Sequence, residues 1–407
     1  MRFKLPVLIG GVAVGVALVA VLALSVRQSA EHASGEEDYD YLSTGDLQKL
    51  DVRLGGTDAV RPTGEVKEFT LVAQQVEWEL LPGVMTTADT FNGAVPGPTI
   101  RITEGDTVRV TVKNELPQET SIHWHGLHVP NEMDGVAGIT QDPIMPGEAF
   151  TYEFIASHAG TFMYHSHSRF SREQIDRGLY GVLIIDPQEP EKPQFAKDYT
   201  LALQGWMVGP EMEGGGPMAM DYNYFTINGK SYPATEPLVV KEGDVVRLRF
   251  INPSQTIHPM HLHGQDFKVV AKDGEPLENP WIGNTLDVEQ GETYDVVFIA
   301  NNPGTWVLHC HDLHHASNNG VEPGGLIQII QYEGVENPIA TEPAEPSPSP
   351  TPLDMPGMGA APVSPSSSPM APDMPGMGAE TVSPTPTPMP EEMPGMGGTD
   401  GMGGMAH

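Results

Sequence analysis

The sequence predicts an all-β protein built from two tandem β-sandwich domains. Short runs of alternating apolar and polar residues, such as "TIRITEGDTVRVTVKNEL" at 99–116, are separated by Gly, Pro and Asn turns, which is the pattern of half-buried strands. The chain also carries a duplication. Residues 91–126 align with residues 227–264 through the same order of an Asn-Gly turn, a strand, Glu-Gly-Asp, a second strand and His-X-His-Gly.

The N-terminal part precedes these domains. Residues 5–26 are uncharged and mostly apolar, long enough to span a bilayer, and a long cleaved signal is the alternative. We therefore interpret residues 1–27 as a signal anchor or signal peptide. Basic residues before this segment and acidic ones after it predict that the remainder lies outside the cytoplasm. Residues 28–65 are polar and acidic, and we expect a flexible tether.

The two domains are predicted at residues 66–187 and 195–333, joined by the linker "PQEPEKPQ" at 187–194. Each is long enough to form a core of its own. Residues 335–407 are rich in Pro, Ser, Thr, Gly and Met. Such a segment buries too little apolar surface to offset its ordering entropy, so we predict a disordered tail.

Charge and cysteine content exclude several classes of function. A net charge of −33 argues against binding to nucleic acid or to anionic lipid, because both repel an acidic surface. Cys310 is the one cysteine of the chain, which excludes an internal disulfide. A lone cysteine is most often a small buried hydrophobic residue, so its neighbours must decide whether it has another role.

Histidines provide the strongest functional signal. Two residues separated by one position point to the same face of a strand, so a His-X-His pair presents two imidazoles together. Imidazole suits Cu, Zn, Fe or Ni. Because the pairs recur at matching ends of the duplicated domains, they predict metal sites rather than solvated side chains. The four pairs are His123/His125, His165/His167, His261/His263 and His309/His311.

Cys310 lies inside "HCHDLHH" at 309–315. With His309 and His311 on one face of the strand, its sulfur projects from the other face, so one strand serves two metal sites. His258 and His315 complete a His₂Cys set, which is the ligand set of blue-copper electron transfer. Zinc does no redox chemistry and needs no such connection. The pattern therefore predicts an electron-entry copper joined to a polynuclear copper cluster.

The motifs "HWHG", "HSHS", "HPMHLHG" and "HCHDLHH", in this order, resemble those of multicopper oxidases (laccases and their relatives) over roughly residues 66–332. The resemblance implies two cupredoxin domains, each a Greek-key β-sandwich or barrel, and four coppers per chain. It implies that Cys310, His309 and His311 carry electrons to the oxygen-reducing cluster. The implied ligands are His258, Cys310 and His315 for type 1 copper, His123 and His261 for type 2, and His125, His165, His167, His263, His309 and His311 for the type 3 pair.

Two further positions follow from the resemblance. The family's axial residue lies five positions after His315, where this chain has Gly320. Reading "NNGVEP" as an insertion makes Leu326 the axial neighbour, and since leucine cannot ligate, it favours Cu(I) and a higher potential. Asp134 matches an acidic position of the family and is the predicted proton donor; the alternative is a turn residue before Gly135.

The predicted reaction is one-electron oxidation of phenols or similar small donors, coupled to reduction of O₂ to water. One alternative is an envelope oxidase of Cu(I) or another metal ion, and a second is a copper-binding protein without turnover. The tail favours copper capture, because "MPGMG" occurs three times, at 355–359, 374–378 and 393–397, and thioethers prefer Cu(I). A plain extension is the other interpretation. The type 1 cysteine in the second domain resembles two-domain laccases, which implies a homotrimer with a cluster at each interface.

Overall fold

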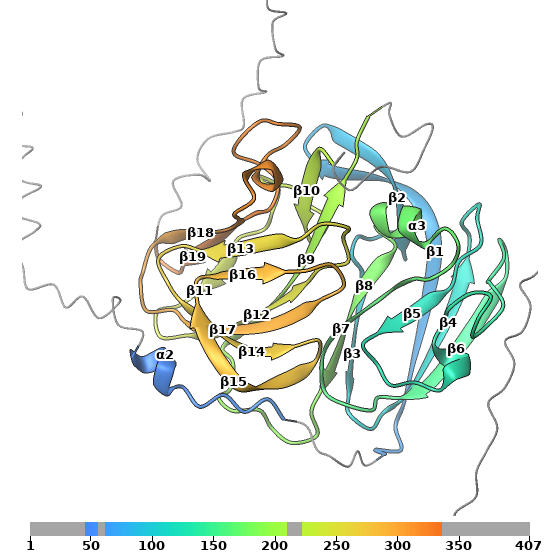
Figure 1. Cartoon of the computed structure of the whole chain (residues 1–407), viewed down its shortest axis with the longest axis horizontal. Coiled ribbons are helices and arrows are strands. Elements are labelled where there is room, and N and C mark those ends of the chain that lie inside the picture. Colours follow the sequence, from blue (N-terminus) through green and yellow to red (C-terminus); the bar gives the residue numbers. More distant parts are fainter. Residues whose placement is uncertain (1–44, 56–61, 210–221, 336–407) are drawn as a thin grey trace, which may run out of the picture. The chain divides into compact units, whose positions relative to one another are not determined.

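The computed structural model describes residues 45–55, 62–209 and 222–335, and in these ranges the all-β prediction is confirmed (Figure 1). The predicted anchor at 1–27 and residues 336–407 of the tail lie outside the described residues. Within the described part, no helix has the length and apolar character needed to cross a membrane. The helical turns there are α2 (Gly45–Lys49), η2 (Asn131–Met133), α3 (Ser171–Asp176) and η5 (Leu313–Ala316).

The first sandwich consists of a sheet in the order β2-β1-β4-β6 and a sheet in the order β3-β8-β7-β5. In β4, Val108, Val110 and Val112 are fully buried and alternate with more exposed polar residues, as the period of a strand requires. Side chains from both sheets share one core. The strands are β1 (Val66–Leu81), β2 (Val84–Phe91), β3 (Gly97–Thr103), β4 (Thr107–Asn114), β5 (Ile122–His125), β6 (Ala149–Ile155), β7 (Gly160–Ser166) and β8 (Tyr180–Asp186).

The second sandwich consists of a sheet in the order β10-β9-β12-β17-β14-β15 and a sheet in the order β11-β19-β18-β13-β16. Its core includes Phe250, Met260, Cys310 and Leu326. The strands are β9 (Lys197–Trp206), β10 (Tyr224–Ile227), β11 (Leu238–Val240), β12 (Val245–Ile251), β13 (His258–Leu262), β14 (Phe267–Lys272), β15 (Glu275–Gly283), β16 (Thr285–Val288), β17 (Thr293–Ile299), β18 (Thr305–Cys310) and β19 (Ile327–Tyr332).

The duplication extends to the backbone. Asn92 and Gly93 have φ of 57° and 76°, and Asn228 and Gly229 have φ of 52° and 74°. These are the left-handed conformations that an Asn-Gly turn of type I′ needs. The second turn also touches the first sandwich, since the indole nitrogen of Trp78 donates to the carbonyl of Gly229 at 2.7 Å.

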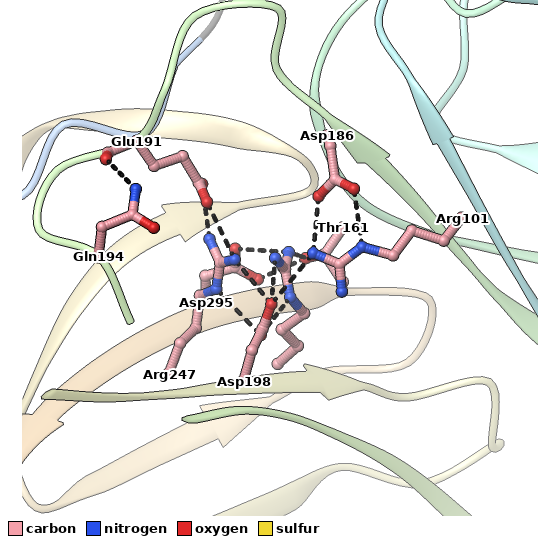
Figure 2. A network of polar contacts seen from close by, with 9 residues as sticks. Arg101, Thr161, Asp186, Glu191, Gln194, Asp198, Arg247 and Asp295 are labelled. Carbon is pink, nitrogen blue, oxygen red and sulfur yellow. Dashed lines mark hydrogen bonds and ion pairs between the residues drawn. The ribbon is translucent and has the colours of Figure 1, made fainter. Parts of the chain in front are cut away.

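A buried ionic network connects the two sandwiches (Figure 2). Arg249 of β12 donates through Nε to Asp198 Oδ1 at 2.8 Å and contacts Asp295 Oδ2 at 3.2 Å. Thr161 of β7, in the first sandwich, donates to Asp295 Oδ1 at 2.6 Å and accepts from Arg249. Arg247 contacts Asp198 Oδ2 at 2.8 Å. Both arginines have almost no exposed surface, and buried charges need such partners.

The linker joins this network. Glu191, which follows the first sandwich, accepts from Nη1 of Arg247 at 2.6 Å. Arg101 of β3 forms a two-pronged pair with Asp186 at 2.7 Å. Arg101 also lies 3.5 Å from Asp198 of β9. Charged side chains of the linker and of the first sandwich therefore both contact the arginine–carboxylate network of the second sandwich.

Part of the predicted tether contacts the second sandwich. Lys268 of β14 donates from Nζ to the carbonyl of Leu50 at 2.7 Å. Arg53 pairs with Lys192 through two backbone hydrogen bonds, of 2.7 and 3.0 Å. Leu47 of α2 is buried. The polar composition of this segment gave no sign of these contacts, because they depend on backbone groups and on one buried leucine.

Candidate metal centres

Strands β13 and β18 place histidines on both faces of one sheet. They pair in antiparallel register, with His261 opposite His309 and Met260 opposite Cys310. Because side chains alternate along a strand, His258 and Cys310 face the core of the sandwich. His261 and His309 face the opposite way.

On the core side, three potential ligands converge. Nδ1 of His258 lies 3.2 Å from Nδ1 of His315, which lies 3.5 Å from Sγ of Cys310. The three ligand atoms lie within 4.8 Å of one another. Two imidazole nitrogens and a thiol are the donors that copper takes in an electron-transfer site. The donor set therefore fits a type 1 copper.

Burial adjusts the protonation of all three groups. It lowers the pKa of His258 well below its ordinary value and that of His315 to about 4, and it raises the pKa of the Cys310 thiol to about 12. These shifts favour the neutral form of both imidazoles, which is the form that binds a metal. The thiol keeps its proton until a cation replaces it, because an unpaired thiolate is costly in an apolar site.

The outer nitrogen of each imidazole also has a neighbour. Nε2 of His258 lies 2.8 Å from Oγ of Ser254, and Nε2 of His315 lies 3.5 Å from a carboxylate oxygen of Asp312. The ring of Phe225 covers His315 at a centroid distance of 4.2 Å. Sequence reasoning missed all three neighbours, although Asp312 stands inside "HCHDLHH".

Leu326 lies in the same core. Its carbonyl accepts from the backbone N–H of Cys310 at 3.0 Å, and its N–H donates to the carbonyl of His315 at 2.9 Å. Asn318 and Val321 exchange backbone hydrogen bonds of 2.8 and 3.0 Å. The predicted insertion thus forms a tight turn that returns the chain to Leu326. An axial position for Leu326 stays a prediction.

The first sandwich gathers one histidine quartet, which consists of His123, His125, His165 and His167. His123 pairs with His165 across β5 and β7. Nδ1 of His125 lies 3.1 Å from Nε2 of His165, and the rings of His123 and His167 are 5.4 Å apart. Burial lowers the pKa of His165 to about 3. Nδ1 of His165 contacts the carbonyl of Ser166 at 2.9 Å, so Nε2 is the nitrogen left for a metal.

The second sandwich gathers a matching quartet of His261, His263, His309 and His311. Nε2 of His263 lies 3.0 Å from Nε2 of His309, and Nδ1 of His309 contacts the carbonyl of Cys310 at 2.8 Å. The rings of His261 and His311 are 5.7 Å apart. The duplication therefore repeats the orientation of His165 and His309. Each has Nδ1 on the carbonyl of the next residue and Nε2 directed at another histidine of its own quartet.

The two quartets do not meet within the chain. Over residues 62–209 and 222–335, histidine ring contacts join members of the same quartet but never the two quartets. Strands β5 and β18 lie apart (Figure 1). His125 borders the turn at Gly291 of the second sandwich, where an added Cβ would lie 3.4 Å from its ring. Each quartet supplies half of the predicted type 2 and type 3 ligands.

Asp134 lies beside the first quartet. Its carbonyl oxygen is 2.9 Å and its carboxylate Oδ1 3.4 Å from Nδ1 of His123. Gly135 has φ of 83°, and a Cβ there would lie 1.7 Å from the carbonyl of Ile122. The tight approach at Gly135 fixes the position of Asp134, so the residue both ends a turn and contacts a predicted ligand.

Known proteins are similar to this chain in sequence and in fold. Two family models described as multicopper oxidase match residues 72–190 and 211–321. The structure of multicopper oxidase mgLAC is 40% identical, with a TM-score of 0.63, over 67% of this chain and 88% of that one. The blue copper oxidase of Nitrosomonas europaea is 39% identical, with a TM-score of 0.63, over 66% and 86%. These matches confirm the predicted cupredoxin fold.

A copper resistance protein A homolog of Pseudomonas syringae pv. tomato is 32% identical over 281 residues, which make up 56% of this chain and 47% of that protein. The chain spans about half the length of the curated relatives it matches.

Proposed function

This chain belongs to the multicopper oxidase family, which implies copper, and we propose that it oxidises phenols or similar small donors one electron at a time and reduces O₂ to water. One observation carries the proposal. Strand β18 presents Cys310 to the buried His₂Cys set and His309 to the opposite face. A copper-binding protein without turnover needs no strand shared between two kinds of site.

In this proposal the chain holds four coppers. Bound at these positions, copper supplies the one-electron steps and the site where O₂ is reduced. The assigned ligands are those of the sequence prediction: His258, Cys310 and His315 for type 1, with Leu326 as axial neighbour; His123 and His261 for type 2; and His125, His165, His167, His263, His309 and His311 for type 3.

The residues of the chain have separate tasks. Cys310 would hold the copper at which electrons enter, and the backbone that joins Cys310 to His309 and His311 would offer a path of a few covalent bonds between the two sites. The apolar wall around Cys310, including Phe225 and Leu326, keeps water from the entry site. Asp134 holds a carboxylate beside His123 and is the proposed source of protons for the reduction of O₂, since general acids must lie within reach of the group they protonate.

The separation of the quartets supports a homotrimer. Each quartet offers only half of the proposed cluster, and His263 and His311 are exposed in one chain. A neighbouring copy can bring its first quartet to the second quartet of this chain, and a repeated contact of this kind forms a ring when the rotation between copies closes. We propose three copies, outside the cytoplasm, with the uncharged residues 5–26 as signal or tether.

The test is a copper count combined with optical absorption and oxygen uptake. We expect about four coppers per chain, an intense blue band from the thiolate site and O₂ consumption with a phenol. One copper per chain, or a blue protein that consumes no O₂ with any reduced donor, would contradict the proposal and favour copper binding without turnover.

A second candidate is an oxidase of Cu(I). It is favoured by the similarity to a copper resistance protein and by the repeated methionines of the tail. The test is a comparison of kcat/KM for Cu(I) and for a phenol, in the full chain and in a chain ending at residue 335. Negligible turnover of Cu(I) by the full chain rules this candidate out.

A further inference from the structure

A hydroxyl group contacts the imidazole nitrogen of His258 that points away from the predicted metal site. Its Nδ1 faces His315, while its Nε2 lies 2.8 Å from Oγ of Ser254 and 3.4 Å from Oγ1 of Thr256. His258 and Ser254 are both buried, with 0% and 2% of their surface exposed. Water therefore does not satisfy Nε2, and Ser254 is its close partner.

Asn252 fixes the direction of this hydrogen bond. Its amide Nδ2 donates to the carbonyls of Thr256 and Val288, both at 2.8 Å. Only nitrogen can donate, so Oδ1 must face Ser254. The Ser254 hydroxyl donates to Oδ1 at 2.7 Å, which turns its lone pairs toward His258. Ser254 thus accepts from His258, whose proton must lie on Nε2.

This arrangement leaves Nδ1 of His258 with a free lone pair. A neutral imidazole carries one proton, and the hydrogen bond at one nitrogen decides which nitrogen binds a metal. Nδ1 is the nitrogen that faces His315 and the thiol of Cys310. The chain from Asn252 through Ser254 to His258 therefore prepares the imidazole to bind a metal before any ion arrives.

The first sandwich supplies a comparison within the same molecule. At a constant offset of 138 residues, Asn114 corresponds to Asn252. Nδ2 of Asn114 donates to the carbonyls of Gln118 and Ile144 at 2.9 and 2.8 Å, and its Oδ1 accepts from the N–H of Leu116 at 2.9 Å. The same turn is built, with Asn at its centre, in both sandwiches.

The two sandwiches differ in this turn at the positions of Ser254 and His258. Leu116 stands at the position of Ser254, and Thr120 stands at the position of His258. The turn therefore forms without a hydroxyl at this position, and within this chain the hydroxyl occurs in the copy that has the imidazole. The need to fold the turn therefore does not explain why a hydroxyl side chain stands at position 254.

We propose that Ser254, oriented by Asn252, is a positioning residue that selects the Nε2-protonated form of His258 and aims its Nδ1 at the type 1 copper. This inference rests on the proposed function. An acceptor on the outer N–H of a metal-bound imidazole holds the ring in place and makes it a stronger base. A stronger base favours Cu(II) over Cu(I), so loss of the acceptor raises the reduction potential.

The experiment uses the full-length protein and Ser254→Ala, with Thr256→Val as the matched control. We expect type 1 copper affinity, measured by competition with a chelator, to fall about 10- to 100-fold in Ser254→Ala. We also expect the blue band to shift and the reduction potential, measured by redox titration, to rise. Thr256→Val removes the more distant hydroxyl, at 3.4 Å, and should leave the affinity, the blue band and the potential unchanged.

A second pair of variants separates the hydroxyl from folding. Ser254→Thr and Ser254→Val have the same shape and differ by that hydroxyl group, and Leu116 shows that the turn accepts an apolar side chain. Thr should keep the affinity and potential of the wild type, and Val should behave like Ala. A Val variant with wild-type affinity and potential overturns the inference, as does a folded Thr variant that matches Val.

The experiment distinguishes failure of the proposed function from failure of the role assigned to Ser254. Wild-type protein that forms no blue copper site overturns the proposed function itself. A blue wild type with an unaffected Val variant overturns only the part played by Ser254.

Discussion

Cys310 has no exposed surface and lies 3.5 Å from a nitrogen of His315. Its sulfur faces the core, whereas its backbone carbonyl accepts from His309 on the other side of the strand. A single residue thus contacts both proposed kinds of site. Replacing Cys310 with serine, which has a similar size but no thiol, tests whether this residue serves both sites.

Cys310→Ser should abolish the blue band and the turnover of phenols, because a hydroxyl does not supply the soft thiolate that this site needs. The copper count should fall by about one per chain, since the histidine quartets are unchanged. Absorption and metal analysis check both points. His314→Ala is the control, because His314 is exposed and should leave the protein blue. A blue Cys310→Ser variant would disprove the assignment.

Asp134→Asn keeps the turn and the carbonyl contact with His123 while it removes the carboxylate. If this carboxylate supplies protons, kcat should fall by about 10²-fold or more, with unchanged copper content and blue colour. Asp142→Asn is the matched control, because Asp142 is exposed and no contact joins it to the quartet. Equal kcat for the two variants would leave Asp134 as a turn residue.

At the scale of elements, the duplication shows what a sequence alone can predict. Alternation, Asn-Gly turns and the His-X-His pairs are local patterns, so strands, duplication and candidate ligands could be read from the chain. β12 shows the limit. The alternation in "VVRLRFI" suggests that Arg247 and Arg249 face solvent, yet both are buried, because that face meets the linker and Thr161. Contacts between distant segments have no local signature.

The same limit applies to the position in the first sandwich that matches the type 1 site. Thr120 and Ser166 stand where the second sandwich has His258 and Cys310. Gln174 of α3 fills the space between them and accepts from both hydroxyls, at 3.0 Å from Thr120. The sequence revealed the duplication, but only the structure shows that α3 replaces metal ligands with hydrogen bonds.

Gln174→Leu should destabilise the protein without affecting its copper. It removes the acceptor that two buried hydroxyls share, so Ser166 loses its acceptor and Thr120 keeps only contacts of 3.4 Å. This loss costs about 1–3 kcal/mol of unfolding free energy. Denaturation by urea measures this loss, and the blue band should stay at its wild-type intensity. Loss of type 1 copper from this variant would show that the two positions are not independent.

At the scale of the whole molecule, the ionic network of Figure 2 should hold the two sandwiches together. Arg249→Met leaves Asp198 and Asp295 without one of their partners, so we expect unfolding free energy to fall by about 3–5 kcal/mol. Arg109→Met is the matched control, because Arg109 pairs with two carboxylates on the surface and should cost less than about 1 kcal/mol. Equal losses of unfolding free energy in the two variants would show that the network stabilises the fold no more than a surface ion pair does.

The effect of Arg249 should depend on pH. Burial alone would raise the pKa of Asp198, but hydrogen bonds from Arg249 and Arg247 hold it well below its ordinary value of 3.8. A depressed carboxyl pKa stabilises the fold above the unfolded value and loses that effect as pH falls. The difference between wild type and Arg249→Met should therefore be constant near neutral pH and shrink below about pH 4.

The assembly can be tested by mixing two inactive chains. His165→Ala disables the first quartet, and His263→Ala disables the second. If each cluster forms between the first sandwich of one copy and the second sandwich of the next, a mixed ring of three has one interface in which both halves are intact. Trimers that carry both variants, purified through two different tags, should recover about one third of the wild-type activity per trimer. If both quartets served one cluster within a single chain, every cluster in the mixture would lack a ligand, and the purified mixture would stay as inactive as either variant alone.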